Sequence, residues 1–404
     1  MPDQKHIRLL IKLVLLTLLI AFIPGSRAFA QEIVDPSVEY IFGEQVIFSG
    51  TVQSEVPVKE IFISFRTRNE TDTFMDRVEI LPGGELVYIH PIEARALRAF
   101  TIIDYWFTIR LDDGTELNSS ANQFEYADNR FAWQTIEETP FEVYWFDGDI
   151  ASAQGVIDVA REGLNRAQGI LPLQKPAQIR LYIYKSADQI PQIPGNNWVA
   201  GHAYPDLELV VVSIPDGPER RLEMERQIPH ELMHVLLFQT AGAGYSNLPT
   251  WLVEGLATMA QLYPTPEYQV LLENGIKTDS LLPISSLCQG FPAHASGAYL
   301  AYAEAAYFTR YIYHQYGSSG LERLVTNYSN GVDCERGAEL ALGVTLSRLE
   351  HQWVKESLGL PAVSVLDKSD QFVPWFFLLA VVLVIPLGAA AAGLLSNQHK
   401  QAQY

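Results

Sequence analysis

Apolar and polar residues alternate along the first third of the chain, in short segments rich in β-branched and aromatic residues. Turn sequences such as Pro82-Gly83-Gly84 and Asp112-Asp113-Gly114 separate these segments. The pattern predicts strands at residues 38–42, 45–51, 60–67, 74–80, 86–92, 101–111 and 124–126. Short strands at this spacing are typical of a β-sandwich of immunoglobulin or fibronectin-III type, which we predict for residues 31–128. Such a fold leaves open whether this part is a spacer or a docking module.

After residue 128 strand-like segments are followed by segments of helical period. Strands are predicted at residues 141–146, 178–184 and 207–212, and helices at 150–170, from about 219, and at 297–316, 321–328, 336–342 and 345–358. This order predicts an α+β domain over residues 129–360. Pro229 lies inside a helical pattern, so we expect a kink there or a fresh helix that starts at Gln227 or Ile228.

Both ends of the chain carry apolar runs. Basic residues, then the run Leu13 to Ile23, then Ala28-Phe29-Ala30 predict a secretory signal peptide at residues 1–30, with an uncleaved signal anchor as the alternative. Residues 372–395 form a nearly unbroken apolar run that is long enough to span a bilayer. We therefore predict a transmembrane helix there, a stalk at 361–371 and a cytoplasmic tail at 396–404. Residues 31–371 would lie outside the cytoplasm, on a single-pass protein of the cell membrane.

Length, composition and net charge further limit the class of protein. The chain has 404 residues, of which 48% are hydrophobic, so it is long and apolar enough for more than one folded core. Its 47 acidic against 28 basic residues give a net charge of −19, which argues against nucleic acid as a partner. Cys288 and Cys334 are the two cysteines, and in an exported chain we expect them to form a disulfide.

The candidate chemistry lies in the sequence His230-Glu231-Leu232-Met233-His234. Histidines four residues apart lie on one face of a helix, where both imidazoles reach one ion. A carboxylate on a second helix, Glu254 in Trp251-Leu252-Val253-Glu254-Gly255, would complete the ligand set. Two imidazoles and a carboxylate leave the fourth position of Zn²⁺ to water, as in catalytic sites. Glu231 would be the general base.

These two motifs resemble those of the gluzincin zinc metallopeptidases, and most closely their peptidase MA-like members. The resemblance covers roughly residues 130–360 and implies a gluzincin-type domain with Zn²⁺ ligands His230, His234 and Glu254 and Glu231 as base. The family's aminopeptidase branch carries a Gly-x-Met-Glu-Asn loop that does not occur in this sequence. We therefore do not expect an exopeptidase of that type.

The resemblance also implies a substrate-binding strand. In gluzincins the edge strand before the zinc helix lines the cleft and pairs with an extended peptide, which here corresponds to residues 201–212. Its candidate substrate-binding residues are Gly201, His202, Ala203 and Tyr204, and we expect His202 to line the cleft rather than bind metal. Two further assignments concern the surroundings of the ion. Tyr302 or Tyr299 would stabilise the oxyanion as a catalytic donor, and Thr258 would orient a ligand.

The sequence thus predicts a membrane-anchored, extracytoplasmic zinc metallopeptidase that hydrolyses polypeptides. The main alternative is a non-enzymatic surface adhesin or sensor with a structural zinc site. A metallohydrolase of a non-peptide amide is a third possibility, because the motif defines the ion and the water but not the substrate.

Overall fold

The computed structural model describes residues 32–68, 70–191 and 201–357. The described residues up to Trp353 pack as one compact unit of mixed α and β structure. This confirms the α+β class. The predicted signal peptide and the predicted transmembrane helix lie outside the described residues. Within the described ranges, every helix is too short or too polar to cross a bilayer.

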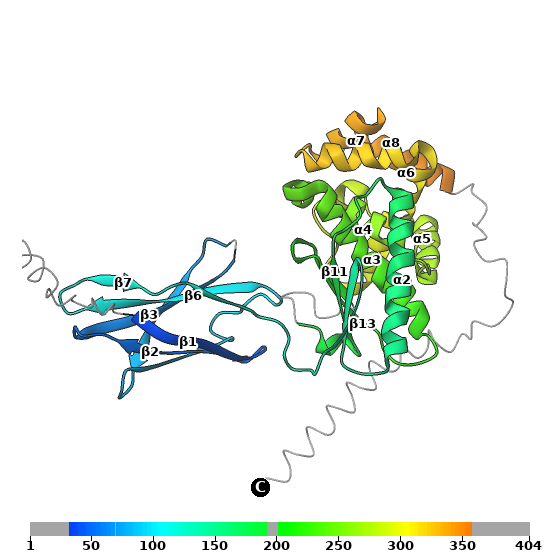
Figure 1. Ribbon diagram of the computed structural model, residues 1–404. Helices are drawn as coiled ribbons and strands as arrows, with labels where there is room; N and C mark the ends of the chain where they lie inside the picture. Colours follow the sequence, from blue (N-terminus) through cyan, green and yellow to red (C-terminus); the bar gives the residue numbers. More distant parts are fainter. Residues whose placement is uncertain (1–31, 69, 192–200, 358–404) are drawn as a thin grey trace, which may run out of the picture. The chain divides into compact units, whose positions relative to one another are not determined.

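The first part of the chain forms an antiparallel sheet of eight strands (Figure 1). The strand order is β1-β2-β5-β4-β3-β6-β7, and β8 also pairs with β6. The strands are β1 Glu32–Ile41, β2 Gln45–Gln53, β3 Val58–Thr67, β4 Phe74–Ile80, β5 Glu85–Pro91, β6 Ile102–Leu111, β7 Glu116–Asn118 and β8 Asn122–Glu125. All seven predicted strands are present, and the three-residue β7 is an addition that was too short to predict.

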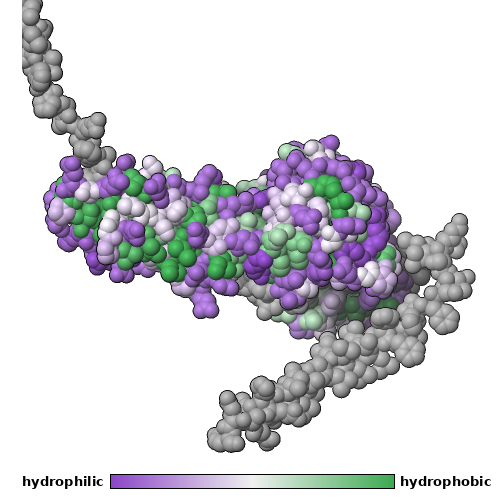
Figure 2. All heavy atoms as spheres, turned by 60° about the horizontal axis from the view of Figure 1, so that its bottom comes forward, coloured by the Kyte–Doolittle hydropathy of each residue, from purple (hydrophilic) through white to green (hydrophobic). Residues whose placement is uncertain are grey.

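The sheet curls so that strands distant in the sheet order share a core. The ring of Phe48 on β2 lies 5.1 Å from that of Phe65 on β3 and 5.1 Å from that of Tyr105 on β6. All three side chains are buried in one hydrophobic cluster. Other apolar side chains stay outside this core: Ile41, Met75 and Ile89 are about half exposed, and Figure 2 shows hydrophobic patches on an otherwise hydrophilic surface.

The second part contains a five-stranded mixed sheet of order β12-β13-β11-β10-β9. Its strands are β9 Gln134–Glu138, β10 Phe141–Trp145, β11 Ile179–Tyr184, β12 Gly201–Tyr204 and β13 Leu209–Ser213. β10, β11 and β13 run parallel, while β9 and β12 pair antiparallel at the two edges. β12 is therefore an edge strand, and it belongs to the segment in which we predicted one.

Helices pack against this sheet and against one another (Figure 1). The α-helices are α2 Ile150–Ile170, α3 Arg220–Ala241, α4 Thr250–Ala260, α5 Pro266–Thr278, α6 Ala295–Ser329, α7 Cys334–Leu342 and α8 Leu346–Ser357. The 3-10 helices are η1 Ala187–Gln189, η2 Pro205–Leu207, η3 Gly242–Asn247 and η4 Ile284–Leu287. α3 contacts β12 and β13 as well as α2 and α4, so it connects the sheet with the helical half.

α3 continues through Pro229 as one helix. The prediction of a fresh helix at Gln227 or Ile228 is therefore wrong. Proline lacks the N–H that would bond the carbonyl of Glu225, and the backbone N–H of Leu262 donates to that oxygen instead, at 2.9 Å. Gly163 of α2 leaves room for the proline ring, because a Cβ at Gly163 would lie 2.9 Å from its Cβ and Cγ. The hydrogen bond from Leu262 thus replaces the one that Pro229 cannot make, and Gly163 provides space for the proline ring.

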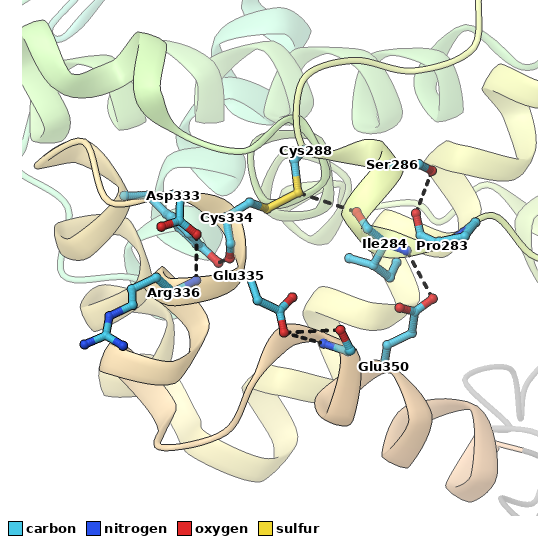
Figure 3. The surroundings of a disulfide bond; sticks show 11 residues. Pro283, Ile284, Ser286, Cys288, Asp333, Cys334, Glu335, Arg336 and Glu350 are labelled. Atoms are coloured by element: carbon cyan, nitrogen blue, oxygen red, sulfur yellow. Dashed lines mark hydrogen bonds between the residues drawn. A yellow bond between two sulfur atoms is a disulfide. The ribbon is translucent and has the colours of Figure 1, made fainter.

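A disulfide joins Cys288 to Cys334, as predicted (Figure 3). It links the end of η4 to the first residue of α7, across a separation of 46 residues. Near it, the carboxylate of Glu350 accepts the backbone N–H of Ile284 at 3.1 Å (Figure 3). The carbonyl of Cys288 in turn accepts the N–H of Thr250, the first residue of α4. The bridged segment is thereby tied to the helix that carries Glu254.

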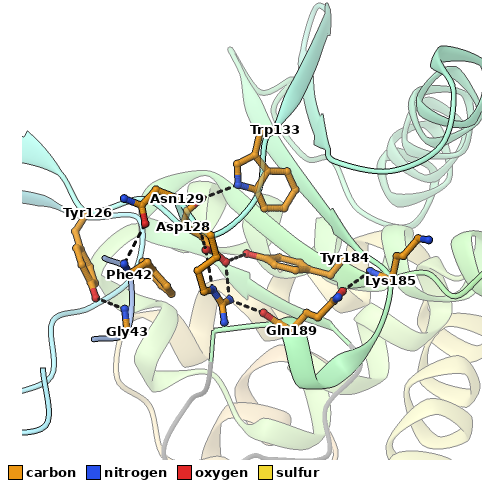
Figure 4. Close-up of polar contacts among 10 residues, drawn as sticks. Phe42, Gly43, Tyr126, Asp128, Asn129, Trp133, Tyr184, Lys185 and Gln189 are labelled. Carbon is orange, nitrogen blue, oxygen red and sulfur yellow. Dashed lines mark hydrogen bonds and ion pairs between the residues drawn. The ribbon is translucent and has the colours of Figure 1, made fainter. Parts of the chain in front are cut away.

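A buried polar cluster connects the eight-stranded part to the five-stranded sheet (Figure 4). Asp128 is 1% exposed, and its carboxylate accepts the hydroxyl of Tyr184 on β11 at 2.9 Å. Arg130 pairs with Asp128 at 2.6 Å and donates to the carbonyl of Gln189. The indole N–H of Trp133 donates to the carbonyl of Asp128. Residues 128–133 are therefore a packed junction with satisfied polar groups, rather than a loose linker.

Candidate metal centre

His230 and His234 lie one turn apart on α3, and Glu254 reaches them from α4. One ligand atom from each residue lies within 4.8 Å of the other two. The Oε2 atom of Glu254 is 3.3 Å from Nε2 of His230 and 3.8 Å from Nε2 of His234. The structure thus brings together the three residues that the sequence singled out as metal ligands, with two ring nitrogens and a carboxylate oxygen facing one point.

Packing explains why α4 comes close enough. Trp251 and Leu252 on its first turn are fully buried. Gly255, next to Glu254, faces α6: a Cβ there would overlap the hydroxyl of Thr309 and lie 2.5 Å from the carbonyl oxygen of Ala305. Any larger residue would push the two helices apart. The glycine of the second motif thus allows the close approach that determines where Glu254 lies.

The donor atoms fit a bound cation. Oε2 of Glu254 is buried and lies 3.3 Å from Nε2 of His230 and 3.8 Å from Nε2 of His234, where one ion could contact all three atoms. Burial lowers the pKa of His234 to about 4, so that this imidazole is neutral near neutral pH. Burial opposes ionisation of Glu254, yet its electrostatic interactions with the imidazoles of His234 and His230 outweigh burial and lower the pKa of this carboxyl. Neutral imidazole and carboxylate are the states that Zn²⁺ requires.

His230 differs from His234 in its electrostatics. Burial disfavours its charged form, but the contact with Glu254 and the charge of Glu231 outweigh burial and raise its pKa. A cation bound between these side chains would have to displace the proton that Glu254 favours on His230. Metal binding at this site should therefore release a proton.

Glu231 is held against the edge strand β12. A Cβ on Gly201 would lie 3.1 Å from Oε1 of Glu231, so the absence of a side chain there gives the carboxylate its space. The backbone of Ala203 donates a hydrogen bond to the same carboxylate. Burial raises the pKa of Glu231 to about 7, with His230 and the Ala203 hydrogen bond opposing it and Glu254 adding to it. A carboxyl that titrates near neutral pH is suited to general acid and base catalysis.

Tyr245, on η3, is a site residue that sequence reasoning missed. Its hydroxyl lies 3.3 Å from Nδ1 of His234. If Nε2 of His234 faces an ion, Nδ1 carries the proton and donates it to the tyrosine oxygen, which fixes the tautomer and the ring orientation. Tyr245 follows the Ala-Gly-Ala-Gly run that ends α3, and that run showed only where the helix stops.

Two of the remaining candidates also lie near the three ligands. The ring of Tyr302 on α6 is 6.5 Å from that of His230, and burial raises its pKa, with Glu254 and Tyr268 adding to the shift. Burial lowers the pKa of His202 to about 4, and the charge of Glu254 opposes this. His202 therefore lies within electrostatic range of the site without being part of the group of three.

Other candidates lie elsewhere or make different contacts. Tyr204 on β12 is buried, and its ring lies 5.6 Å from the guanidinium carbon of Arg98. Tyr299 is 48% exposed. The prediction for Thr258 is wrong: its buried hydroxyl makes no hydrogen bond with any residue that the structure describes. One turn along α4 from Glu254, its side chain lies within the helix packing instead of against a ligand.

Two histidines on one helix and a glutamate on the next, with a second glutamate beside them, are the side-chain set of zinc hydrolases. Residues 158–358 match the family model described as Peptidase MA superfamily. This match supports a gluzincin-like metallopeptidase, a hydrolase of polypeptides, in this part of the chain.

The other comparisons give weaker similarities. No curated protein matches the chain. The M1 zinc metallopeptidase from Deinococcus radiodurans aligns with a TM-score of 0.36 at 13% identity, over 84% of this chain and 96% of that one. A myokine structure aligns with a TM-score of 0.20 at 12% identity, over 24% of this chain and 97% of that one. Wild-type OgpA from Akkermansia muciniphila aligns with a TM-score of 0.19 at 17% identity, over 24% of this chain and 28% of that one.

Proposed function

We propose that the protein is a zinc-dependent peptidase that hydrolyses peptide bonds in extended polypeptides. The observation that carries the proposal is the convergence of His230, His234 and Glu254, with the carboxylate of Glu231 beside them. His230, His234 and Glu254 would hold the ion. A Zn²⁺ ion bound there would supply a Lewis acid and lower the pKa of a water molecule.

Glu231 performs the proton transfers in this proposal. Its carboxylate takes a proton from the water that adds to the peptide carbonyl, and returns a proton to the leaving amide nitrogen. Burial favours the protonated form of this carboxyl, so that it can return a proton as well as accept one. Tyr302 is our candidate donor to the oxyanion, because its ring lies near His230 and burial keeps its hydroxyl protonated.

The edge strand β12 is the proposed binding surface for substrate. Among the described residues, β12 pairs along one edge with β13 and has no strand on its other edge, where we propose that an extended peptide binds. The backbone of Ala203 donates to Glu231, and Gly201 leaves room for its carboxylate, which would place a peptide on this edge next to the general base. Main-chain pairing of this kind accepts many sequences, whereas the partly exposed side chain of His202 would contribute selectivity.

We further propose an extracytoplasmic, membrane-anchored location with a cleaved signal peptide at residues 1–30 and an anchor helix at 372–395. These assignments rest on the sequence pattern. For residues 31–128 we propose an immunoglobulin-like β-sandwich, supported by the curled antiparallel sheet whose strands β2, β3 and β6 share one core.

Metal analysis and peptide digestion test the proposal together. Purified residues 31–371 should contain about one zinc per chain, as the ligand count of the site requires. A peptide library should be cleaved, a chelator should stop cleavage, and added Zn²⁺ should restore it. Bound zinc without turnover on any peptide would favour the non-enzymatic adhesin or sensor. Turnover of other amides alone would favour a different hydrolase.

A further inference from the structure

A cavity of about 770 Å³ lies on the eight-stranded part and shares no residue with the candidate metal centre. Its lining includes Arg66, Arg68, Asp104, Trp106, Asn122 and Gln123. β3 and β6 form its floor, and the segment from β7 to β8 forms one side. The cavity is open to solvent, and its volume is comparable with that of small-ligand clefts.

Strand register gathers these side chains in one place. Arg66 pairs with Asp104 across β3 and β6, and Asp104 pairs with Gln123 across β6 and β8. The intervening residues Phe65, Ile103 and Tyr105 are buried in the core. Since side chains alternate between the faces of a sheet, the polar row lies on the outer face. Three strands thus supply one polar floor.

Contacts within the cavity fix some of its groups. The guanidinium of Arg68 pairs with Asp104 at 2.7 Å and also donates to the side-chain oxygen of Gln123. Trp106 is half-buried, and its cross-strand neighbour Ser64 is fully buried. A large aromatic surface is thus held among oriented polar groups.

Charge distinguishes this cavity from the rest of the protein. The chain carries −19, yet the cavity contains two arginines and one carboxylate. Asp104 is already paired with Arg68. Arg66 lies with its guanidinium carbon 5.7 Å from the Trp106 ring centre and makes no ion pair with any described residue. One cation beside an aromatic face thus remains available to an anionic ligand.

We propose that this cavity binds a carboxylated saccharide. The C–H face of a sugar ring packs against an indole, and hydroxyl groups both donate and accept hydrogen bonds, which suits the amides of Asn122 and Gln123. A carboxylate on the sugar would pair with Arg66 in the two-pronged geometry that guanidinium favours. An extended peptide would instead need a free strand edge, whereas this cavity lies across the strands.

A glycan array tests the proposal with the full-length, metal-loaded protein in detergent. It should carry sialylated, uronic-acid and neutral oligosaccharides, with acidic peptides as a further set. We expect binding to carboxylated glycans and at least tenfold weaker binding to their neutral counterparts. Comparing sialylated with uronic-acid glycans on the array shows which of the two carboxylated sugars is bound. Binding of acidic peptides alone, equal binding of neutral glycans, or no binding would overturn the proposal.

Substitutions in the cavity test whether the glycan binds there. Trp106→Ala and Arg66→Ala should each weaken carboxylated-glycan binding at least tenfold, and Arg66→Ala should also remove the preference over neutral glycans. Trp106→Phe keeps a smaller aromatic face and should bind with intermediate affinity. Arg77→Ala, on the exposed part of β4, is the matched control and should bind normally. Unchanged binding in both alanine variants, with melting temperatures equal to that of the wild type, would place the glycan elsewhere.

Discussion

At the scale of single residues, the candidate site depends on a few contacts between polar groups that a motif does not describe. Gly201 leaves room for the carboxylate of Glu231, and Ala203 donates to it. Tyr245 contacts Nδ1 of His234. These residues would determine where the general base and one ligand point, and therefore how well the proposed chemistry proceeds.

Gly201→Ala should reduce peptide hydrolysis about tenfold while zinc content stays unchanged, because misplacing a catalytic group by a fraction of an ångström is costly. The added Cβ would lie 3.1 Å from Oε1 of Glu231 and 3.2 Å from Val212, so one of them must move. Steady-state kinetics on a peptide substrate measure the effect. Gly169→Ala is the control, since its Cβ would meet nothing within 4 Å. Equal rates in all three proteins would contradict this role of Gly201.

Tyr245→Phe should weaken zinc binding by roughly tenfold, because the hydroxyl that orients His234 is lost. Competition with a fluorescent chelator measures the affinity. Tyr313→Phe on α6, whose hydroxyl contacts the carbonyl of Gly169 in α2, is the matched control and should bind zinc as the wild type does. If Tyr245→Phe retains full affinity, the contact with Nδ1 does not support the ligand.

The sequence was informative about residues only where chemistry demands a fixed spacing. His230, His234 and Glu254 were found because one helical turn and one returning helix suffice to relate them. Tyr245 and the backbone of Ala203 were not, because their contacts depend on how η3 and β12 pack against α3. No rule of sequence spacing identifies a tyrosine that follows a glycine-rich run as a residue of a metal site. Thr258 shows the opposite case. Its hydroxyl lies one helical turn from Glu254, yet it makes no hydrogen bond with any described residue.

At the scale of elements, many helices and strands begin and end close to where the pattern of apolar and polar residues predicts. Where an element differs from that prediction, contacts with other elements explain the difference. Residues 150–170 were predicted as a helix and form α2, whose N-cap Asp149 accepts the N–H of Ser152. α3 passes through Pro229 because Leu262 satisfies the freed carbonyl of Glu225. The strand β7 has only three residues, which are too few for an alternating pattern to reveal it.

A buried carboxyl on α6 gives the helical half a pH dependence. Glu304 is fully buried, accepts the N–H of Leu282 at 2.9 Å, and leaves its second oxygen without a partner among the described residues. Burial raises its pKa to about 8, above the ordinary value of 4.5. Between these values the folded protein holds a proton that the unfolded chain has lost. The free energy of unfolding should therefore fall as pH rises from about 4.5 to about 8.

Glu304→Gln should flatten this decline, because glutamine keeps an acceptor for Leu282 and cannot ionise. We expect the pH slope of the free energy of unfolding to differ from that of the wild type by up to about 1.4 kcal/mol per pH unit. Urea denaturation from about pH 5 to about pH 8 measures the slope. Glu322→Gln, an exposed position on the same helix, should leave it unchanged. An equal slope in Glu304→Gln and wild type would show that Glu304 ionises normally.

At the scale of the whole molecule, the eight-stranded part contacts the turn beside the proposed substrate strand. Arg98 makes a two-pronged ion pair with Asp206 on η2, at 2.6 and 2.5 Å, and lies over the ring of Tyr204. η2 connects β12 to β13. Phe100 packs against Tyr182 and Tyr204 in the same cluster. The eight-stranded part therefore supports one wall of the candidate site, which sequence patterns within each part could not reveal.

Arg98→Ala should lower kcat/KM for extended peptides by about fivefold, the effect of losing roughly 1 kcal/mol of a partly exposed ion pair. Zinc content should stay the same, because no ligand is touched. Arg77→Ala, also an exposed arginine of the eight-stranded part, serves as the control. Identical kinetics for Arg98→Ala and wild type would mean that this contact does not influence the substrate strand.

We propose that Glu231 acts as the base at a zinc site formed by His230, His234 and Glu254. The most direct test compares peptide hydrolysis by the wild type and Glu231→Gln at equal zinc occupancy, with metal content measured on the same samples. We predict that Glu231→Gln binds as much zinc as the wild type and hydrolyses peptides at least about a hundredfold more slowly. Hydrolysis at the wild-type rate by the zinc-loaded variant would contradict the claim.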